Sequence, residues 1–387
     1  MKTFLLTCWL GIAGVSAFAG VFSDLPFDAA RNLAAGSGKI VLIDFYTTWC
    51  GPCKMLDKTT WTDPAVIQLL ESKTVALRLD AEKETALAQR YRIAAYPTVL
   101  LLKADGSEID RLVGYREPQA FISDFTASLA GKDSVKRAQE AVEKAPAGDA
   151  SARMQYGQAL AQKGMDAEAL KEYVWCFDHG LEKDQSFTGV RLSFLLSDIM
   201  NLANHYPAAK AALVTRRDDR NAKLIGGSTD YQNIVDLISL NKTLGETQRN
   251  MVVFDKLPAN SKTRVIVRRL IVEQLLDAKR YADVLDGTDG KSDFERSVSR
   301  FNAVIGMLHN STTQALIRSS TAKSGAQDFE ALAGLKRNDE GKELGRLVLE
   351  FDSSQETRDA LAKGATRAGN LELAEFAKEY QVKKTAQ

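Results

Sequence analysis

Two cysteines separated by two residues, Cys50 and Cys53, stand directly after an almost unbroken apolar run at residues 40–46. Such a run suits a central β-strand that is buried on both faces. Pro52, between the cysteines, is favourable in the first turn of a helix, so the pair is expected to open a helix. A buried strand that leads straight into a helix constrains this part of the chain to a sheet covered by helices.

Strand and helix patterns alternate over about residues 24–130. Asp63 and Pro64 mark a helix start, because proline is favourable at the first helical position. The other patterns predict helices at residues 28–35, 83–91 and 118–129, strands at residues 74–79 and 98–102, and a turn at residues 104–106. This alternation predicts an α/β domain whose central sheet is covered on both faces.

The pattern changes after Gly131, and almost no strand signal follows. Apolar residues then recur at helical spacing in a composition dominated by Ala, Leu, Lys, Glu and Arg. The sequence therefore predicts a leader at residues 1–19, the α/β domain at residues 20–131, a linker at residues 132–148 and an all-α domain at residues 149–387.

One helical hairpin, residues 150–183, has a more specific pattern. Its small and aromatic packing residues are Gly157, Gly164, Ala169, Tyr173 and Cys176. The segment resembles one tetratricopeptide repeat, a unit of about 34 residues that needs stacked neighbours to bury its apolar face. We therefore expect a tetratricopeptide-like domain of helical repeats, in which Cys176 is a buried and inert packing residue.

Cys50 and Cys53 have the spacing of a dithiol exchange site. Free N–H groups and the helix dipole stabilise a thiolate at a helix N-terminus, so Cys50 is predicted to be the exposed nucleophile. Cys53 lies one turn further and can resolve a mixed disulfide. Half of a zinc site has the same C-x-x-C pattern, but no second pair of this kind completes it, which favours redox chemistry.

Residues 49–53 (WCGPC) resemble the thioredoxin active-site motif residue for residue, and the resemblance covers about residues 24–130. It implies a thioredoxin-like domain with a central mixed sheet flanked by helices, and thiol–disulfide oxidoreductase activity. Asp44 matches the buried acid that serves this family as a proton acceptor for the resolving thiol. Burial raises the pKa of a carboxyl group towards neutrality, which suits that role; a structural acid at a strand end is the alternative.

The resemblance also implies a substrate groove. Tyr96, Pro97 and Thr98 match the family's cis-proline loop, and Gly114 matches a glycine that lines the groove. A cis X–Pro bond lets the backbone approach the redox pair and bond to a substrate strand, whereas an ordinary proline turn is the alternative. The substrate-binding residues predicted in this way are Trp49, Gly51, Pro52, Tyr96, Pro97 and Gly114.

Two features distinguish the chain from the usual thioredoxin pattern. Thioredoxins carry a lysine beside the buried acid, and the matching position looks like Ala76, with Arg78 two residues later. Residues 60–66 are similar to the C-terminal domain of the bacterial transmembrane disulfide-interchange reductase, which implies a reducing role outside the cytoplasm. Because redox direction depends on potential differences of tens of millivolts, oxidation and isomerisation stay open beside reduction.

The first residues have the pattern of a secretory signal. Lys2 is followed by an apolar run at residues 4–15 and by residues 17–19 (AFA), which fit signal-peptidase cleavage. We therefore expect a soluble mature protein, in the periplasm or secreted, without a membrane segment. An uncleaved anchor is one alternative, although a spanning helix needs about 20 apolar residues; a lipoprotein linked through Cys8 is another.

Composition argues against several other functions. The formal net charge of +1 gives no broad surface for nucleic acid. The three histidines are not spaced with cysteines or carboxylates as metal ligands, and no Gly-rich phosphate loop precedes a helix. Neither a metal nor a nucleotide cofactor is expected.

Two hypotheses for the whole chain follow. In the first, it is an exported thiol–disulfide oxidoreductase that reduces or isomerises disulfides of other exported proteins and is served by an upstream redox partner. Its helical half then recruits substrates or that partner. In the second, the helical array is an interaction scaffold and the thioredoxin-like domain is an accessory. Trp61 and Trp175 are expected to be core residues.

Overall fold

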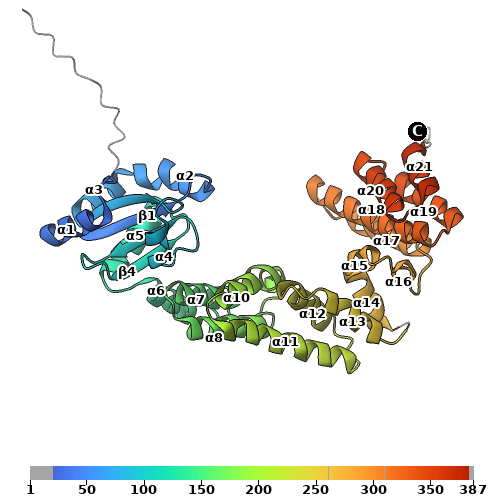
Figure 1. Cartoon of the computed structure of the whole chain (residues 1–387), viewed down its shortest axis with the longest axis horizontal. Coiled ribbons are helices and arrows are strands. Elements are labelled where there is room, and N and C mark those ends of the chain that lie inside the picture. Colours follow the sequence, from blue (N-terminus) through green and yellow to red (C-terminus); the bar gives the residue numbers. More distant parts are fainter. Residues whose placement is uncertain (1–20, 260, 309, 383–387) are drawn as a thin grey trace, which may run out of the picture. The chain divides into compact units, whose positions relative to one another are not determined.

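A computed structural model of the chain describes residues 21–259, 261–308 and 310–382 (Figure 1). The chain divides into two compact units, Met1–Asp198 and Ile199–Gln387. The division lies well after residue 149, where the sequence places the start of the all-α domain, so the first helices of that domain belong to the same unit as the sheet. The predicted signal at residues 1–19 lies outside the described residues.

Unit 1 contains a four-stranded mixed sheet, which confirms the predicted α/β class. Its strands are β1 (Ile40–Tyr46), β2 (Thr74–Asp80), β3 (Thr98–Leu102) and β4 (Glu108–Val113). Their order is β2-β1-β3-β4, with β1 parallel to β2 and antiparallel to β3, and β3 antiparallel to β4. The apolar run at residues 40–46 is therefore a central strand, as predicted.

The two faces of the sheet have separate hydrophobic cores. The elements that supply them are α1 (Phe27–Ser37), α2 (Gly51–Lys58), the 3-10 turn η1 (Thr60–Thr62), α3 (Pro64–Lys73), α4 (Thr85–Arg90) and α5 (Pro118–Leu129). Val41, Ile43 and Phe45 of β1 pack in the core that includes α1 and α4 residues, whereas Leu42 packs in the core formed with α2, η1, α3 and α5. Because strand side chains alternate between faces, Asp44 points to the same face as Leu42.

Residues 132–148, which the sequence predicts as a linker, contain helix α6 (Ser134–Lys144) and short connections. The helix is held on the edge strand β4 by Asp110, whose carboxylate accepts hydrogen bonds from Ser134 N (3.0 Å) and Arg137 Nη1 (3.1 Å). Lys163 Nζ reaches the same strand at Glu108 Oε1 (3.3 Å). These contacts join residues far apart in sequence, which explains why local composition did not reveal them.

The predicted hairpin at residues 150–183 is present as α7 (Ala150–Gln162) and α8 (Asp166–His179). Gly157 allows the two helices to approach closely, since a Cβ atom there would lie 2.7 Å from the ring of Tyr173. Cys176 is buried, and its thiol donates to Ala150 O (3.4 Å). A closely packed helix pair is thus observed, while its assignment to the tetratricopeptide class stays a prediction.

Beyond β4 the described residues form helices and their connections, in agreement with the expected helical half. After α8 the elements are η2 (Gln185–Phe187), α9 (Thr188–Val190), the π-helical turn η3 (Arg191–Leu195), α10 (Leu196–Ala203), α11 (Pro207–Ile225), α12 (Tyr231–Thr243), α13 (Gln248–Lys256), α14 (Lys262–Leu270), α15 (Val272–Asp277), α16 (Tyr281–Val284), α17 (Lys291–Ile305), α18 (Ser311–Gly334), α19 (Asn338–Phe351), α20 (Gln355–Arg367) and α21 (Leu371–Glu379).

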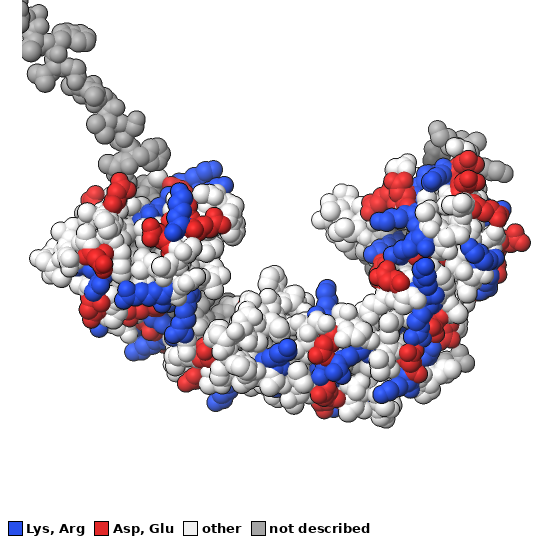
Figure 2. Space-filling model, in the orientation of Figure 1, with Lys and Arg blue, Asp and Glu red and all other residues white. Residues whose placement is uncertain are grey.

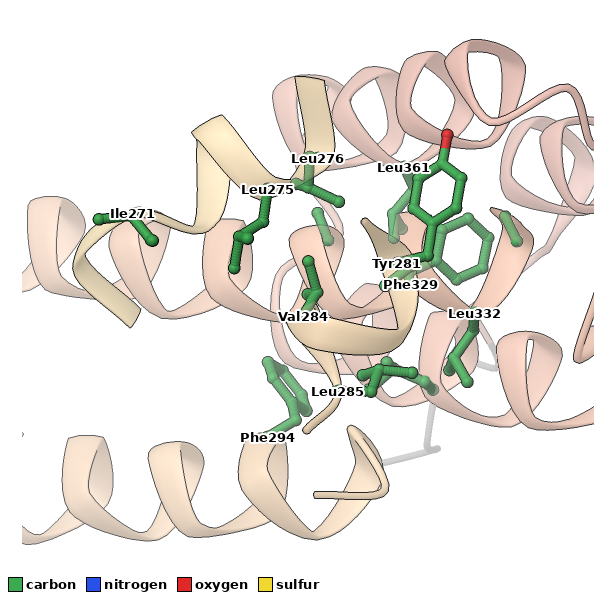
Figure 3. Close-up of a cluster of buried hydrophobic side chains, with 14 of the residues drawn as sticks. Ile271, Leu275, Leu276, Tyr281, Val284, Leu285, Phe294, Phe329, Leu332 and Leu361 are labelled. Atoms are coloured by element: carbon green, nitrogen blue, oxygen red, sulfur yellow. The ribbon is translucent and has the colours of Figure 1, made fainter. Parts of the chain in front are cut away.

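Unit 2 is built around its own hydrophobic core (Figure 3). Leu275 of α15 and Tyr281 of α16 are buried in it together with Phe329 and Leu332 of α18 and Leu361 of α20. Burial of apolar side chains from successive helices is the arrangement expected of stacked helical pairs.

Charged side chains of both signs are interspersed over the face of each unit that Figure 2 shows. Within the described ranges, no helix combines the length and the apolar character that crossing a bilayer requires.

Candidate active site

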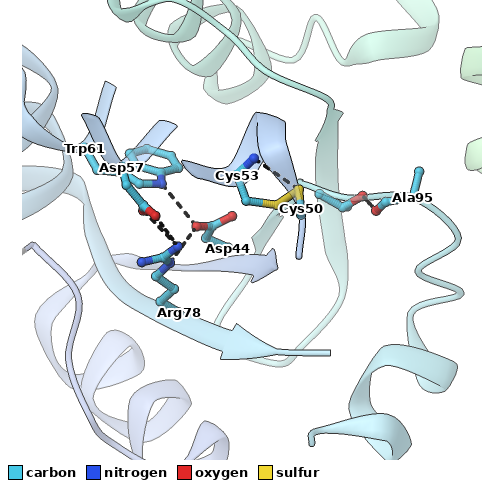
Figure 4. Close-up of a disulfide and its surroundings, with 8 residues drawn as sticks. Asp44, Cys50, Cys53, Asp57, Trp61, Arg78 and Ala95 are labelled. Atoms are coloured by element: carbon cyan, nitrogen blue, oxygen red, sulfur yellow. Dashed lines mark hydrogen bonds and ion pairs between the residues drawn. A yellow bond between two sulfur atoms is a disulfide. The ribbon is translucent and has the colours of Figure 1, made fainter. Parts of the chain in front are cut away.

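The two cysteines lie at the start of α2, the helix that follows β1 (Figure 4). Cys50 is the N-cap residue of α2, and its Sγ accepts a hydrogen bond from Cys53 N (3.1 Å). The two sulfurs form a disulfide with an S–S distance of 2.08 Å. A sulfur at this position faces the free N–H groups at the positive end of the helix, the environment that stabilises a thiolate.

The exposure of Cys50 differs from the prediction. The sequence predicts an exposed sulfur, but only 3% of Cys50 is accessible, and Cys53 is buried as well. The disulfide joins Cys50 to Cys53, which lies in the interior. The residue that stands in solvent beside the pair is Trp49, which is 65% exposed.

Trp49 is held by contacts with two other segments. Its indole Nε1 donates to Glu82 Oε1 (2.9 Å), which follows β2. Its ring meets the ring of Tyr96 edge to face, with 6.0 Å between centroids. Trp49 and Tyr96, both predicted to bind substrate, are thus neighbours, and the exposed ring of Trp49 with the half-buried ring of Tyr96 forms an aromatic surface next to the disulfide.

The other predicted groove residues take the following places. Pro52 lies in the first turn of α2, next to Gly51, whose Cα faces open space. The Tyr96–Pro97 bond is cis, as the sequence predicts. Gly114 N donates to Pro97 O (2.8 Å), so Gly114 and the cis-proline loop are directly linked. A φ of +84° at Gly114 favours glycine, because side chains rarely adopt that conformation.

Asp44 is completely buried on β1, on the side of the sheet that carries α2. Its Oδ2 accepts a hydrogen bond from Trp61 Nε1 (3.1 Å) and lies 3.3 Å from Arg78 Nε. Burial raises the pKa of Asp44 to about 7, although the Arg78 charge and the Trp61 hydrogen bond both oppose this rise. A carboxyl group with this pKa can take up and release a proton near neutral pH.

The two carboxylate oxygens of Asp44 have different surroundings. Oδ2 has the partners just described, whereas Oδ1 is buried without a hydrogen bond to any described residue. In Figure 4 the second oxygen is directed towards the disulfide, on the side away from Trp61 and Arg78. The structure therefore brings Asp44 to the predicted cysteine pair.

The position beside Asp44 is occupied by Arg78 rather than Ala76. In the β1–β2 register Arg78 lies opposite Asp44, and Ala76 lies opposite Leu42. The Arg78 guanidinium also donates from Nη2 to Asp57 Oδ2 (2.9 Å) on α2 and stacks over the ring of Tyr46. The neighbour of the acid is therefore the residue two positions after Ala76, because the register of a parallel pair is not visible in one strand's sequence.

Trp61 is the site residue that sequence reasoning missed. It is buried in the core, as predicted, but its N–H is also the hydrogen-bond donor to Asp44. The signal that could have identified it is chemical: a buried indole N–H needs an acceptor, and Asp44 is the carboxylate expected on the same face.

Within the part of the chain that the structure describes, no three His, Cys, Asp or Glu side chains are grouped to hold a metal ion. What the arrangement offers is a disulfide at a helix start, an aromatic surface beside it and a proton-exchanging carboxyl group behind it. These are the parts that thiol–disulfide exchange requires.

Comparison with known proteins gives consistent matches to this part of the chain. A family model described as a thioredoxin-like domain matches residues 27–125. A thioredoxin of Mycolicibacterium smegmatis is 34% identical over 107 residues, which cover 26% of this chain and 89% of that protein.

Two longer proteins match over the same region. The chloroplastic thioredoxin Y1 of Arabidopsis thaliana is 36% identical over 103 residues, or 27% of this chain and 58% of that protein. The thiol:disulfide interchange protein DsbD of Pseudomonas fluorescens is 34% identical over 116 residues, or 28% of this chain and 20% of that protein. This chain thus spans little more than half of the first protein and a fifth of the second.

Proposed function

The chain belongs to the thioredoxin family, and we propose that it is a thiol–disulfide oxidoreductase that works through Cys50 and Cys53. The observation that carries the proposal is the position of the Cys50 sulfur, which caps the N-terminus of α2 and is joined to Cys53. The N-cap position stabilises the thiolate, which is the attacking species in disulfide exchange.

In the reducing direction the reaction has two steps. The Cys50 thiolate attacks one sulfur of a substrate disulfide, forming a mixed disulfide and releasing the other substrate sulfur as a thiolate, which takes a proton from water. Cys53 then loses its proton to Asp44 and attacks the Cys50 sulfur, which releases the second substrate sulfur. The substrate gains two electrons, and Cys50 and Cys53 are left as a disulfide, which an upstream redox partner reduces for the next cycle.

The substrates that we propose are disulfides of exported proteins, which the enzyme reduces or isomerises. Support comes from the signal-like residues 1–19 and from the match to DsbD, a protein named for thiol:disulfide interchange. The exposed ring of Trp49 and the half-buried ring of Tyr96, which belongs to the cis-proline loop, offer a surface on which an extended substrate segment can lie. The helical region recruits substrates or the redox partner.

Reduction of insulin disulfides, with dithiothreitol as the electron source, tests the activity. We expect the wild-type chain to accelerate precipitation of the insulin chains, and Cys50→Ser to show only the rate of dithiothreitol alone. Cys176→Ser is the matched control and keeps full activity, since that thiol is buried away from the site. Equal activity of Cys50→Ser and the wild type would refute the assignment.

A trapping experiment identifies substrates and tests the scaffold alternative. Cys53→Ala leaves the mixed disulfide without its resolving thiol, so exported proteins should be captured through Cys50. If Cys50→Ser restores function fully in cells that lack the wild-type gene, the helical scaffold is the working part instead.

Export is tested by the N-terminus of the protein recovered from the cell envelope. Cleavage after Ala19 predicts a mature chain that begins at Gly20. Full-length protein retained in the cytoplasm would contradict the proposed location.

A further inference from the structure

Resting on the proposed function, we propose that Trp61 and Arg78 are positioning residues for the resolving step. They hold the Asp44 carboxylate by Oδ2 and so leave Oδ1 as the oxygen that receives the proton of Cys53. The proposal depends on the asymmetry of the two oxygens, because Oδ2 has a hydrogen bond from Trp61 and an ion pair with Arg78, whereas Oδ1 has no hydrogen bond to a described residue.

Packing fixes the orientation of the Trp61 ring and therefore the direction in which its N–H donates. Its ring contacts Phe22 edge to face at a centroid distance of 5.3 Å, and Phe121 in the same way at 5.1 Å. Aromatic rings packed on two sides leave the indole little freedom to rotate. The hydrogen bond to Asp44 Oδ2 is therefore a fixed part of the core.

Arg78 is held independently of Asp44. Asp57 on the cysteine helix binds its Nη2, and the ring of Tyr46 lies 4.2 Å from its guanidinium carbon. The Arg78 guanidinium thereby keeps its positive charge beside the Asp44 carboxylate in a fixed orientation.

The charged groups packed around Asp44 are paired with each other, so Asp44 is the carboxyl group that takes the proton of Cys53. β2 contributes Arg78, and α2 contributes Asp57 together with the cysteines, while on β3 the residue opposite Asp44 is Val99. Asp57 is engaged with Arg78 and is partly open to solvent. Asp44 is buried between this ion pair and the disulfide (Figure 4).

The resolving step needs no reactant other than the mixed disulfide, Cys53 and Asp44. The proton of the Cys53 thiol moves to Asp44 Oδ1, and the Cys53 sulfur bonds to the Cys50 sulfur. The bond between Cys50 and the substrate sulfur breaks, and its electron pair leaves with the substrate as a thiolate. Trp61 and Arg78 touch neither sulfur; they act through Asp44.

The test measures the resolving step alone over a range of pH. The full chain carries Cys8→Ser, so that this thiol cannot react, and is reduced before mixing with dithiobis-nitrobenzoate. Cys50 releases the first coloured thiolate when it forms the mixed disulfide, and attack by Cys53 releases the second. The rate of the second phase is expected to rise with pH around a midpoint near 7, because Asp44 must be ionised to accept the proton.

Trp61→Phe keeps an aromatic ring but removes the N–H donor to Oδ2. We expect the midpoint to move up by about 1 pH unit, a tenfold change in the acid constant, since the ionised carboxylate has lost a hydrogen bond. Arg78→Gln should move it in the same direction, and Arg78→Lys should restore part of the shift by restoring the charge. Trp175→Phe, a tryptophan that contacts Arg153 and His179 instead, leaves the midpoint unchanged.

The outcomes separate this inference from the proposed function. If Trp61→Phe and Arg78→Gln resolve the mixed disulfide with the wild-type pH profile, the positioning role is refuted while the dithiol activity stands. If the wild-type chain never releases the second thiolate, the proposed function fails first. A drop in rate at every pH with the same midpoint would also count against the inference, because a loss of packing alone gives that result.

Discussion

Replacing Asp44 by asparagine should make unit 1 more stable above about pH 4, and most of all at neutral or higher pH. The carboxyl group is completely buried, and its pKa is raised from the ordinary 3.8 to about 7 because burial disfavours the charge. Between these two pH values the folded chain holds a proton that the unfolded chain has released. The free energy of unfolding of the wild type therefore falls as pH rises through this range, and the loss is complete above pH 7.

The size of the effect follows from the same two values. At about 1.4 kcal/mol for each pH unit between 3.8 and about 7, the ionised Asp44 costs about 4 kcal/mol of stability at pH 8. Asparagine has the shape of a protonated aspartate and can still accept the Trp61 hydrogen bond. Asp44→Asn should therefore match the wild type near pH 4 and exceed it by about 4 kcal/mol near pH 8.

Denaturant unfolding followed by tryptophan fluorescence measures this difference in the right unit. All tryptophans of the described ranges, Trp49, Trp61 and Trp175, lie in unit 1, so the signal reports on that unit although the chain has two. Asp24→Asn, which alters an exposed acid, is the control and should follow the wild-type curve. Parallel stability curves for Asp44→Asn and the wild type from pH 4 to pH 8 would refute the reasoning.

Other features of unit 1 lead to further predictions. Asp110→Asn should lower stability by about 3 kcal/mol, because it removes the buried charge that holds Arg137; urea unfolding near pH 7 measures this, and a loss below 1 kcal/mol would contradict it. Gly157→Ala should cost about 1–3 kcal/mol by overpacking α7 on α8, while Gly36→Ala, where the added methyl meets open space, should not destabilise in the same assay. Cys176 should resist iodoacetamide near pH 8 until the chain is denatured, because burial raises the pKa of its thiol to about 12; labelling of the folded protein would show that the site is open.

The elements with strong local patterns were predictable from the sequence. The strands at residues 40–46 and 98–102 and the helix at residues 118–129 have the predicted bounds. The helix predicted at residues 83–91 is shorter, Thr85–Arg90, because element ends depend on how the terminal backbone groups are bonded. Periodicity identifies an element, while its ends depend on contacts outside it.

The segment between the sheet and the hairpin shows where local patterns fail. Helix α6 has no completely buried residue, and its composition is polar enough to be read as a connection. It is anchored through Asp110, which lies 27 residues before Arg137 in the chain. A contact at that separation follows from the tertiary fold and leaves no signal in the segment's own sequence.

In the candidate site, too, some residues were predictable from the sequence and others were not. Cys50, Cys53 and the cis-proline loop were predicted correctly because each belongs to a short, contiguous sequence motif. The pairing of Asp44 with Arg78 depends on the register between two parallel strands, and the bond from Trp61 depends on how η1 folds over the sheet. One-residue differences in register change which side chain faces a buried acid, so these partners emerge only from the fold.

The environment of Asp44 links stability to reactivity. A buried carboxylate oxygen without a hydrogen bond destabilises the fold, and a neutral side chain would remove that cost. The same oxygen can accept a proton because no described residue is hydrogen-bonded to it. Asp44→Asn should thus have opposite effects in two assays, with higher stability near pH 8 and slower resolution of the mixed disulfide. An acid with a structural role alone would change the first measurement and leave the second unaltered.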